Sequence, residues 1–162
     1  MPELKFDDGI IELDVNGNGM LRFNPADLNV YQRLCTLLRE LPELEKKYAA
    51  EVDATSAQRP NPESLSSSEV VELAGEDLDK AKEIDAEVKK KLAWVFGPGN
   101  DFDQLLGGIN IMSPGRNGER AITNFLNAIT PYLKDGMKRH MQDAAADAVS
   151  EAKKDRAKRV NQ

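Results

Sequence analysis

Residues 9–28 read GIIELDVNGNGMLRFNPADL, and this stretch decides the fold. Apolar and polar side chains alternate over residues 11–15, which is the pattern of a half-buried strand. The dipeptide Asn16-Gly17 follows, and it favours a tight hairpin turn because both central positions of such a turn need a positive φ. The stretch predicts a β-hairpin over residues 9–23. Two strands alone are marginal in water, so we expect the hairpin to pack on helices or to pair with further strands.

A helix start follows the hairpin directly. Asn24 is a typical N-cap residue, Pro25 suits the first helical position, and Asp27 would lie near the positive end of the helix. Leucines then recur at helical spacing, so we expect a helix over residues 25–52. Pro42 predicts a kink or a break near residues 40–41.

The remaining chain is predicted to be helical apart from two loops. Residues 53–67 are polar and contain two prolines, which predicts a mobile loop. A helix over residues 68–96 follows, with charged pairs such as Asp85 and Lys89 at i,i+4 spacing on its outer face. After a glycine-rich loop we expect a helix over residues 119–134, bent by Pro131.

The predicted fold class is therefore α+β and predominantly α-helical. It consists of an N-terminal β-hairpin followed by three main helices and a helical C-terminal tail. Residues 1–136 are expected to form a single domain. Residues 137–162 are an alanine-rich tail with a cluster of basic residues at its end, and few large apolar groups follow Met141. We expect this tail to fray or to need a partner.

Composition argues against several classes of protein. The 162 residues carry a net charge of -6, and a chain of this charge is a poor binder of nucleic acid. No apolar run approaches the length of about 20 residues that spans a membrane. The first residues lack a basic segment followed by an apolar one, so export is not expected. A single cysteine fits a reducing compartment.

Catalysis has few candidate residues. The chain has one histidine, His140, which lies among charged residues and is expected to be solvated. Its one cysteine, Cys35, lies on the predicted apolar face of the first helix and is expected to be a buried, inert thiol. No pair of carboxylates stands out from the charged helix faces. We therefore expect a non-enzymatic protein without a cofactor.

One segment partly matches a calcium-binding loop. Asp14, Asn16 and Asn18 place oxygen atoms at alternate positions, and Gly19 is the sixth residue of the pattern. The twelfth residue is Pro25, which has no side-chain oxygen where the loop requires a bidentate glutamate. A hairpin turn accounts for the same residues, so no metal site is expected. A calcium-binding adaptor is kept as a less favoured alternative.

Aromatic residues are the best candidates for contact with a partner. Trp94 lies next to the Gly97-Pro98-Gly99 turn, and Tyr132 lies beside Pro131. Phe125 is the third candidate. Aromatics make up only 6% of the chain, so ordinary core packing is the competing interpretation for each of these residues.

Three segments together resemble a known family. They read FNPADLNVYQRL at residues 23–34, VFG at residues 95–97 after an acidic helix, and ITNFLNAITPYL at residues 122–133 before a charged tail. With the short N-terminal β element, this arrangement resembles the tail assembly chaperones of long-tailed bacteriophages of Gram-positive hosts.

The resemblance implies a small protein of the host cytoplasm that coats the phage tape measure protein, which is a long helical chain with exposed apolar stripes. It also implies a homo-oligomer, for which the hairpin edge at residues 9–23 is the expected contact. A groove between the first and third helices would hold the client, and the basic tail would add electrostatic attraction. The alternative is a structural component of the virion, such as a tail completion or connector protein.

Overall fold

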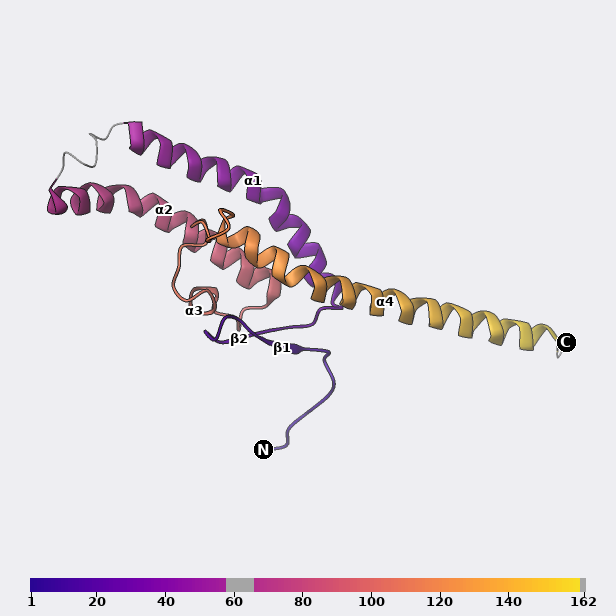
Figure 1. Cartoon of the computed structure of the whole chain (residues 1–162). Helices are drawn as coiled ribbons and strands as arrows, with labels where there is room; N and C mark the ends of the chain where they lie inside the picture. The colour runs from indigo at the N-terminus through magenta and orange to yellow at the C-terminus, as the bar shows by residue number, and fades with distance from the viewer. Residues whose placement is uncertain (58–65, 161–162) are drawn as a thin grey trace.

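The computed structural model describes residues 1–57 and 66–160, without the side chains of residues 51–57, 69–78, 143, 144, 147 and 160. In chain order the elements are β1 (Ile11–Asp14), β2 (Met20–Phe23), α1 (Leu28–Ala57), α2 (Ser67–Phe96), α3 (Phe102–Leu105) and α4 (Ala121–Val160). The predicted fold class is confirmed: a small antiparallel hairpin precedes a predominantly helical chain (Figure 1).

The hairpin forms where its turn signal predicts it. Strands β1 and β2 pair in antiparallel register from Ile11 opposite Phe23 to Asp14 opposite Met20. Both turn residues have a positive φ, 54° at Asn16 and 76° at Gly17, as the turn requires. The strands are shorter than the predicted span of residues 9–23. Residues 1–10 instead form an exposed N-terminal arm that leads away from the body (Figure 1).

Helix α1 begins one turn later than predicted. The backbone carbonyl of Asn24 accepts from the amide of Asp27 at 3.2 Å, so residues 24–27 form a separate turn. The helix then starts beyond Asp27, whose Oδ1 accepts from the amide of Asn29 at 2.9 Å. Asp27 therefore takes the capping role that the sequence analysis assigned to Asn24.

Of the kink or break predicted near Pro42, the break does not occur. Helix α1 continues through this proline to Ala57 and changes direction along its course (Figure 1). Of the predicted loop over residues 53–67, residues 53–57 belong to α1, Ser67 begins α2, and residues 58–65 lie outside the described residues.

Helix α4 joins two segments that the sequence analysis separated at residue 136. It runs without interruption through Pro131 and Gly136, so the predicted helix over residues 119–134 and the helical tail form one element. Gly136 lies inside this helix, at a close approach to another segment. Its Cα packs so tightly on the turn before α1 that an added Cβ would collide with the carbonyl group of Pro25 and would lie 2.9 Å from the amide nitrogen of Ala26.

The hydrophobic core lies where the helical hairpin α1–α2 meets the β-hairpin, α3 and the first half of α4 (Figure 1). Four phenylalanine rings connect these elements: Phe96 of α2 lies 5.1 Å from Phe23, 5.9 Å from Phe102 and 5.9 Å from Phe125, measured between ring centroids. The second half of α4 projects beyond this core. No helix in the described part of the chain combines the length and the mean hydropathy that crossing a membrane requires.

Candidate functional site

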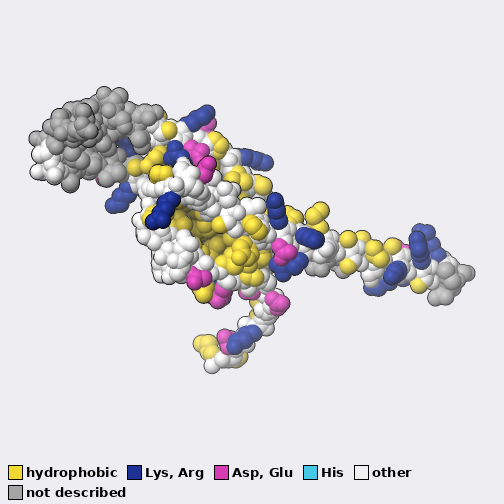
Figure 2. All heavy atoms as spheres, viewed as in Figure 1, with side chains coloured by type: hydrophobic (Ala, Val, Ile, Leu, Met, Phe, Trp, Pro, Cys, Tyr) yellow, Lys and Arg dark blue, Asp and Glu magenta, His cyan; other side chains and the backbone are white. Residues whose placement is uncertain are grey.

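A groove lies between the β-hairpin and α4 and has a volume of about 850 Å³. One wall is β1 with its turn, residues 12–16, and a second wall is the loop over residues 106–115. The third wall is a face of α4 formed by Phe125, Ala128, Ile129 and Tyr132, which are spaced as one side of a helix. We call this the β1–α4 groove. A broad apolar patch marks the same region (Figure 2).

The loop wall of the groove is fixed to α2 by a buried cation. The Nζ atom of Lys89 donates to Asp85 at 2.8 Å, to Asp103 at 2.7 Å and to the carbonyl of Ile109 at 2.8 Å. Asp85 also accepts from the amide of Ile111 at 2.7 Å. Residues 109–111 are therefore held in place by side chains of α2 one helical turn apart.

Lys89 stays charged although only 7% of the residue is exposed. Burial by itself lowers the pKa of this ammonium group, but the hydrogen bonds that it donates to the Asp103 and Asp85 carboxylates, together with their negative charges, outweigh burial and raise the pKa. The same contact with Lys89 lowers the pKa of the exposed Asp103 carboxyl. The sequence analysis expected Asp85 and Lys89 to pair on the solvated face of their helix. The pair forms, but it is buried because the loop packs over it.

The two edges of the β-hairpin differ. The outer edge of β2 is capped by the buried Asn100, whose Oδ1 accepts from the amide of Arg22 at 2.9 Å and whose Nδ2 donates to the carbonyl of Arg22 at 2.9 Å. The sheet has two strands in the described part of the chain, so the outer edge of β1 carries no strand. Because residues 12–16 all line the groove, this free edge faces into it.

The residues of the weak calcium pattern serve the hairpin. The Oδ1 atom of Asp14 accepts from the amide of Gly17 at 2.8 Å, which fixes the turn. The Nδ2 atom of Asn18 donates to the carbonyl of Leu105 at 3.1 Å, which attaches the turn to α3. Asn16 occupies the first positive-φ position. Among the described residues, no group of three or more His, Cys, Asp or Glu side chains could hold a metal ion.

The three aromatic candidates fall at two places. Phe125 and Tyr132 both line the β1–α4 groove; Phe125 is partly buried against the core, whereas Tyr132 is half-exposed. Trp94, also half-exposed, lies in a separate hollow between α1 and α2 beside the ion pair of Lys91 with Glu40 at 2.5 Å. The groove expected between the first and third helices is thus formed by β1 and α4, and α1 contributes none of its lining residues.

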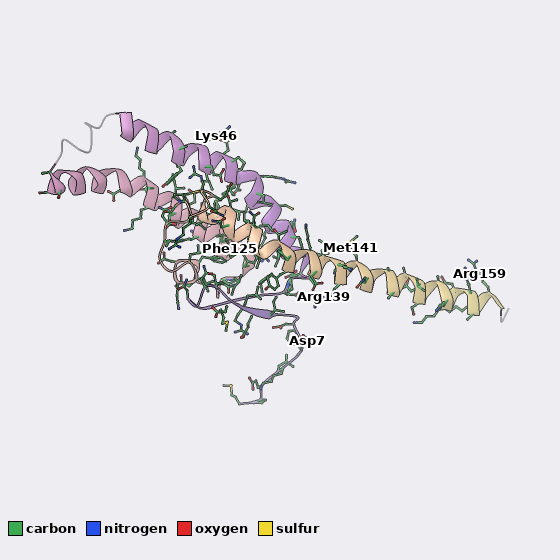
Figure 3. The ribbon with its side chains drawn as sticks, viewed as in Figure 1. Asp7, Lys46, Phe125, Arg139, Met141 and Arg159 are labelled. Atoms are coloured by element: carbon green, nitrogen blue, oxygen red, sulfur yellow. The ribbon has the colours of Figure 1, made fainter. Side chains whose placement is uncertain are left out.

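The projecting half of α4 offers a different kind of surface. Six of its apolar residues share one side of the helix, because successive residues are about 100° apart, whereas Ala146 and Ala157 fall on the opposite side. We call these six residues the α4 stripe: Met137, Met141, Ala145, Ala148, Val149 and Ala152. Met141 is 64% exposed and Val149 is 55% exposed. Phe125 lies within the body, whereas Met141 and Arg159 lie on the projecting half (Figure 3).

The two residues considered for catalysis lie apart from this groove. Cys35 was expected to be buried, and this expectation is wrong: its thiol is exposed on α1. Leu34 and Leu37 of the same helix are buried in the core, whereas Cys35 between them in the sequence is not. His140 is exposed on α4, as expected for a solvated residue.

Sequence reasoning missed the polar residues that shape the groove. Lys89 and Asn100 are buried polar groups whose partners come from segments distant in the sequence, at residues 103–109 and at residue 22. For Lys89, the i,i+4 spacing predicts the ion pair with Asp85, but it does not predict the contacts with Asp103 and Ile109. No local pattern indicated Asn100, because its role depends on a strand edge that only the folded chain brings near.

The chain matches no protein-family model, no curated protein and no solved structure in the corresponding comparisons.

Proposed function

We propose that the chain is a non-enzymatic tail assembly chaperone of a bacteriophage, and that it shields the tape measure protein before the tail tube forms around it. The observation that carries the proposal is the α4 stripe: half of a 40-residue helix projects with Met141 and Val149 largely exposed. The family resemblance of residues 23–34, 95–97 and 122–133 supplies the identity of the client.

A projecting amphipathic helix suits a helical client. An isolated alanine-rich helix is only marginally stable in water, so a partner that covers its apolar side would stabilise it. Two helices that bury apolar stripes against each other gain about 25 cal/mol for each Å² of apolar area removed from water. The α4 stripe has only two or three large side chains, so each contact would be weak. Weak contacts repeated along a long client suit a coat that must later be displaced.

Charge at the end of α4 would add attraction at longer range. Lys153, Lys154, Arg156, Lys158 and Arg159 cluster in the last turns of the helix, against Glu151 and Asp155. This basic end favours an acidic segment of a client helix, and its effect should weaken as salt concentration rises.

Co-expression with the tape measure protein of the same phage tests the proposal. We expect the client to stay soluble and to co-purify with the chain. The variant Met141→Asp should lower the recovered client severalfold, because it places a charge in the stripe. The control Ser150→Asp adds the same charge to the opposite side of the projecting helix and should leave the yield unchanged.

Two outcomes would contradict the proposal. If the client precipitates in the presence of the wild-type chain, the chaperone function is wrong. If the chain is instead a stoichiometric part of purified virions, the alternative of a tail completion or connector protein is correct.

A further inference from the structure

The N-terminal arm leaves large apolar side chains uncovered. All ten residues of the arm are exposed, with Leu4 at 89% and Phe6 at 75%. These two residues are separated by one position, so in an extended segment both side chains point to the same face. Glu3 and Lys5 alternate with them on the other face and form an ion pair at 3.1 Å. This alternation of apolar and charged side chains is typical of a strand that buries one of its faces.

A fixed bend directs the arm away from the body. Gly9 has a φ of 72°, and an added Cβ there would lie 2.7 Å from the Nδ2 atom of Asn24. The same Nδ2 atom donates to the carbonyl of Asp8 at 2.9 Å. Since the arm runs directly into β1, it would have to reverse at this bend to reach the free edge of its own β1. The hydrogen bond from Asn24 instead holds the arm in a direction that leads away from the body (Figure 1).

The free edge of β1 has the hydrogen-bonding groups that an added strand needs. The amide of Val15 donates to the carbonyl of Gly19 at 2.9 Å, and bonded pairs alternate along an antiparallel ladder. Leu13 and Ile11 are therefore the bonded residues of β1, and the backbone groups of Glu12 and Asp14 point outward. The corresponding outward groups of Arg22 on β2 are already capped by Asn100.

We propose that the arm of one copy adds as a strand to the free edge of β1 in a second copy and places Leu4 and Phe6 in the β1–α4 groove. Each chain carries one arm and one groove, so donor and acceptor match in number. Backbone pairing at Glu12 and Asp14 would supply affinity, and the apolar face of Phe125, Ile129 and Tyr132 would supply specificity for the two side chains.

This contact joins unlike surfaces, so it links copies head to tail. Such contacts generate closed rings or open chains, or a reciprocal dimer when two copies exchange arms. The proposal does not depend on the client, because it uses the groove and leaves the α4 stripe free. Its failure would therefore leave the proposed function untouched.

Paired substitutions in the arm test the contact by sedimentation of the full-length protein. Leu4→Ser with Phe6→Ser should weaken self-association about a hundredfold, because two apolar side chains lose their burial. Glu3→Ser with Lys5→Ser changes the neighbouring face of the same arm and should associate like the wild-type chain. The arm lies outside the core, so both variants should keep the wild-type unfolding temperature. A wild-type chain that is monomeric at all concentrations, or that associates equally in both variants, would overturn the proposal.

A second variant tests strand addition separately from apolar contact. Glu12→Pro removes an outward amide while the β1–β2 bonds of Ile11 and Leu13 remain, and proline is tolerated on an edge strand. We expect Glu12→Pro to fold, as judged by its unfolding temperature, and to associate about tenfold more weakly because one backbone bond is lost. Unchanged association in a folded Glu12→Pro variant would contradict pairing at this edge.

Mixed copies distinguish exchange between chains from folding within one chain. In a Cys35→Ser background, Phe6→Cys and Tyr132→Cys are placed on separate chains, mixed and oxidised. The proposal predicts a disulfide-linked dimer that contains one chain of each kind. When both cysteines are placed on one chain, it predicts disulfide-linked copies, as a ladder for rings or open chains and as a dimer for reciprocal exchange. A disulfide formed only within single chains would contradict it.

Discussion

At the scale of single residues, Gly136 decides how α4 meets α1. Glycine within a helix normally destabilises it by about 1 kcal/mol relative to alanine, so Gly→Ala is usually favourable there. Here the Cβ of an alanine would collide with the carbonyl group of Pro25. The Tyr31 hydroxyl makes the junction tighter still, because it lies against the carbonyl oxygens of both Pro25 and Leu133.

Gly136→Ala should therefore destabilise the protein by about 2 kcal/mol or more, since the backbone of one helix must shift to relieve the overlap. Denaturant unfolding measures this change. Gly99→Ala is the control, because an added Cβ there meets no atom within 4 Å, and its effect should be within about 0.5 kcal/mol of zero. A neutral or stabilising Gly136→Ala would contradict the close packing of Gly136 on Pro25.

Lys89 and Lys91 form a second matched pair, two residues apart on α2. Lys89→Met should lower the free energy of unfolding by about 3 kcal/mol. It leaves the largely buried Asp85 without its cation, and it removes the hydrogen bond to the carbonyl of Ile109 that fixes the loop. Lys91→Met breaks an ion pair with Glu40 whose side chains are 30% and 46% exposed, and it should cost less than about 1 kcal/mol. Equal effects on the free energy of unfolding would contradict the anchoring role of Lys89.

At the scale of secondary structure elements, the two halves of α4 have different stabilities. The first half buries Ile122, Ile129 and Leu133 in the core, whereas residues 141–160 project from it. Truncation after His140 should therefore leave the unfolding temperature unchanged within about 2 °C. The helical signal should fall, because residues 141–160 are lost, and circular dichroism measures both quantities. A large drop in unfolding temperature would mean that the projecting half stabilises the body.

Local signals predicted most of the elements correctly. The Asn16-Gly17 turn, the leucine spacing of α1 and the glycine-rich end of α2 are each local signals, formed by residues that are close to one another in the sequence, so each can be recognised without the fold. The helix predicted to end at residue 134 continues because glycine is judged by its low helix propensity, whereas tertiary packing carries α4 through Gly136. Pro42 lies inside α1, which changes direction along its course (Figure 1).

The candidate site was less predictable than the elements. Tyr132 and Phe125 were chosen as aromatic residues, but the groove that contains them depends on β1 and on the loop that Lys89 anchors. The exposed arm was equally invisible in the sequence, because residues 1–10 could have paired with β1 in the same chain. In the structure, the bend that Asn24 fixes through the carbonyl of Asp8 directs the arm away from β1 of its own chain.

At the scale of the whole molecule, the chain presents two apolar surfaces on a well-packed body. The β1–α4 groove is framed by fixed walls and matches an extended segment, whereas the α4 stripe is an open helical face. We assign the groove to a second copy and the stripe to the client. This division lets a chain of copies present many parallel α4 helices to one long partner, which would raise the effective affinity of individually weak contacts.

Hydrogen exchange of the α4 amides, with and without the tape measure protein, tests the central claim most directly. The account predicts that residues 141–152 exchange rapidly in the free chain and become at least about tenfold slower in the complex, while residues 122–133 are protected in both. The chain concentration is kept the same in both samples, so self-association cannot produce the difference. Client bound without added protection of residues 141–152 would contradict the claim that the α4 stripe holds it.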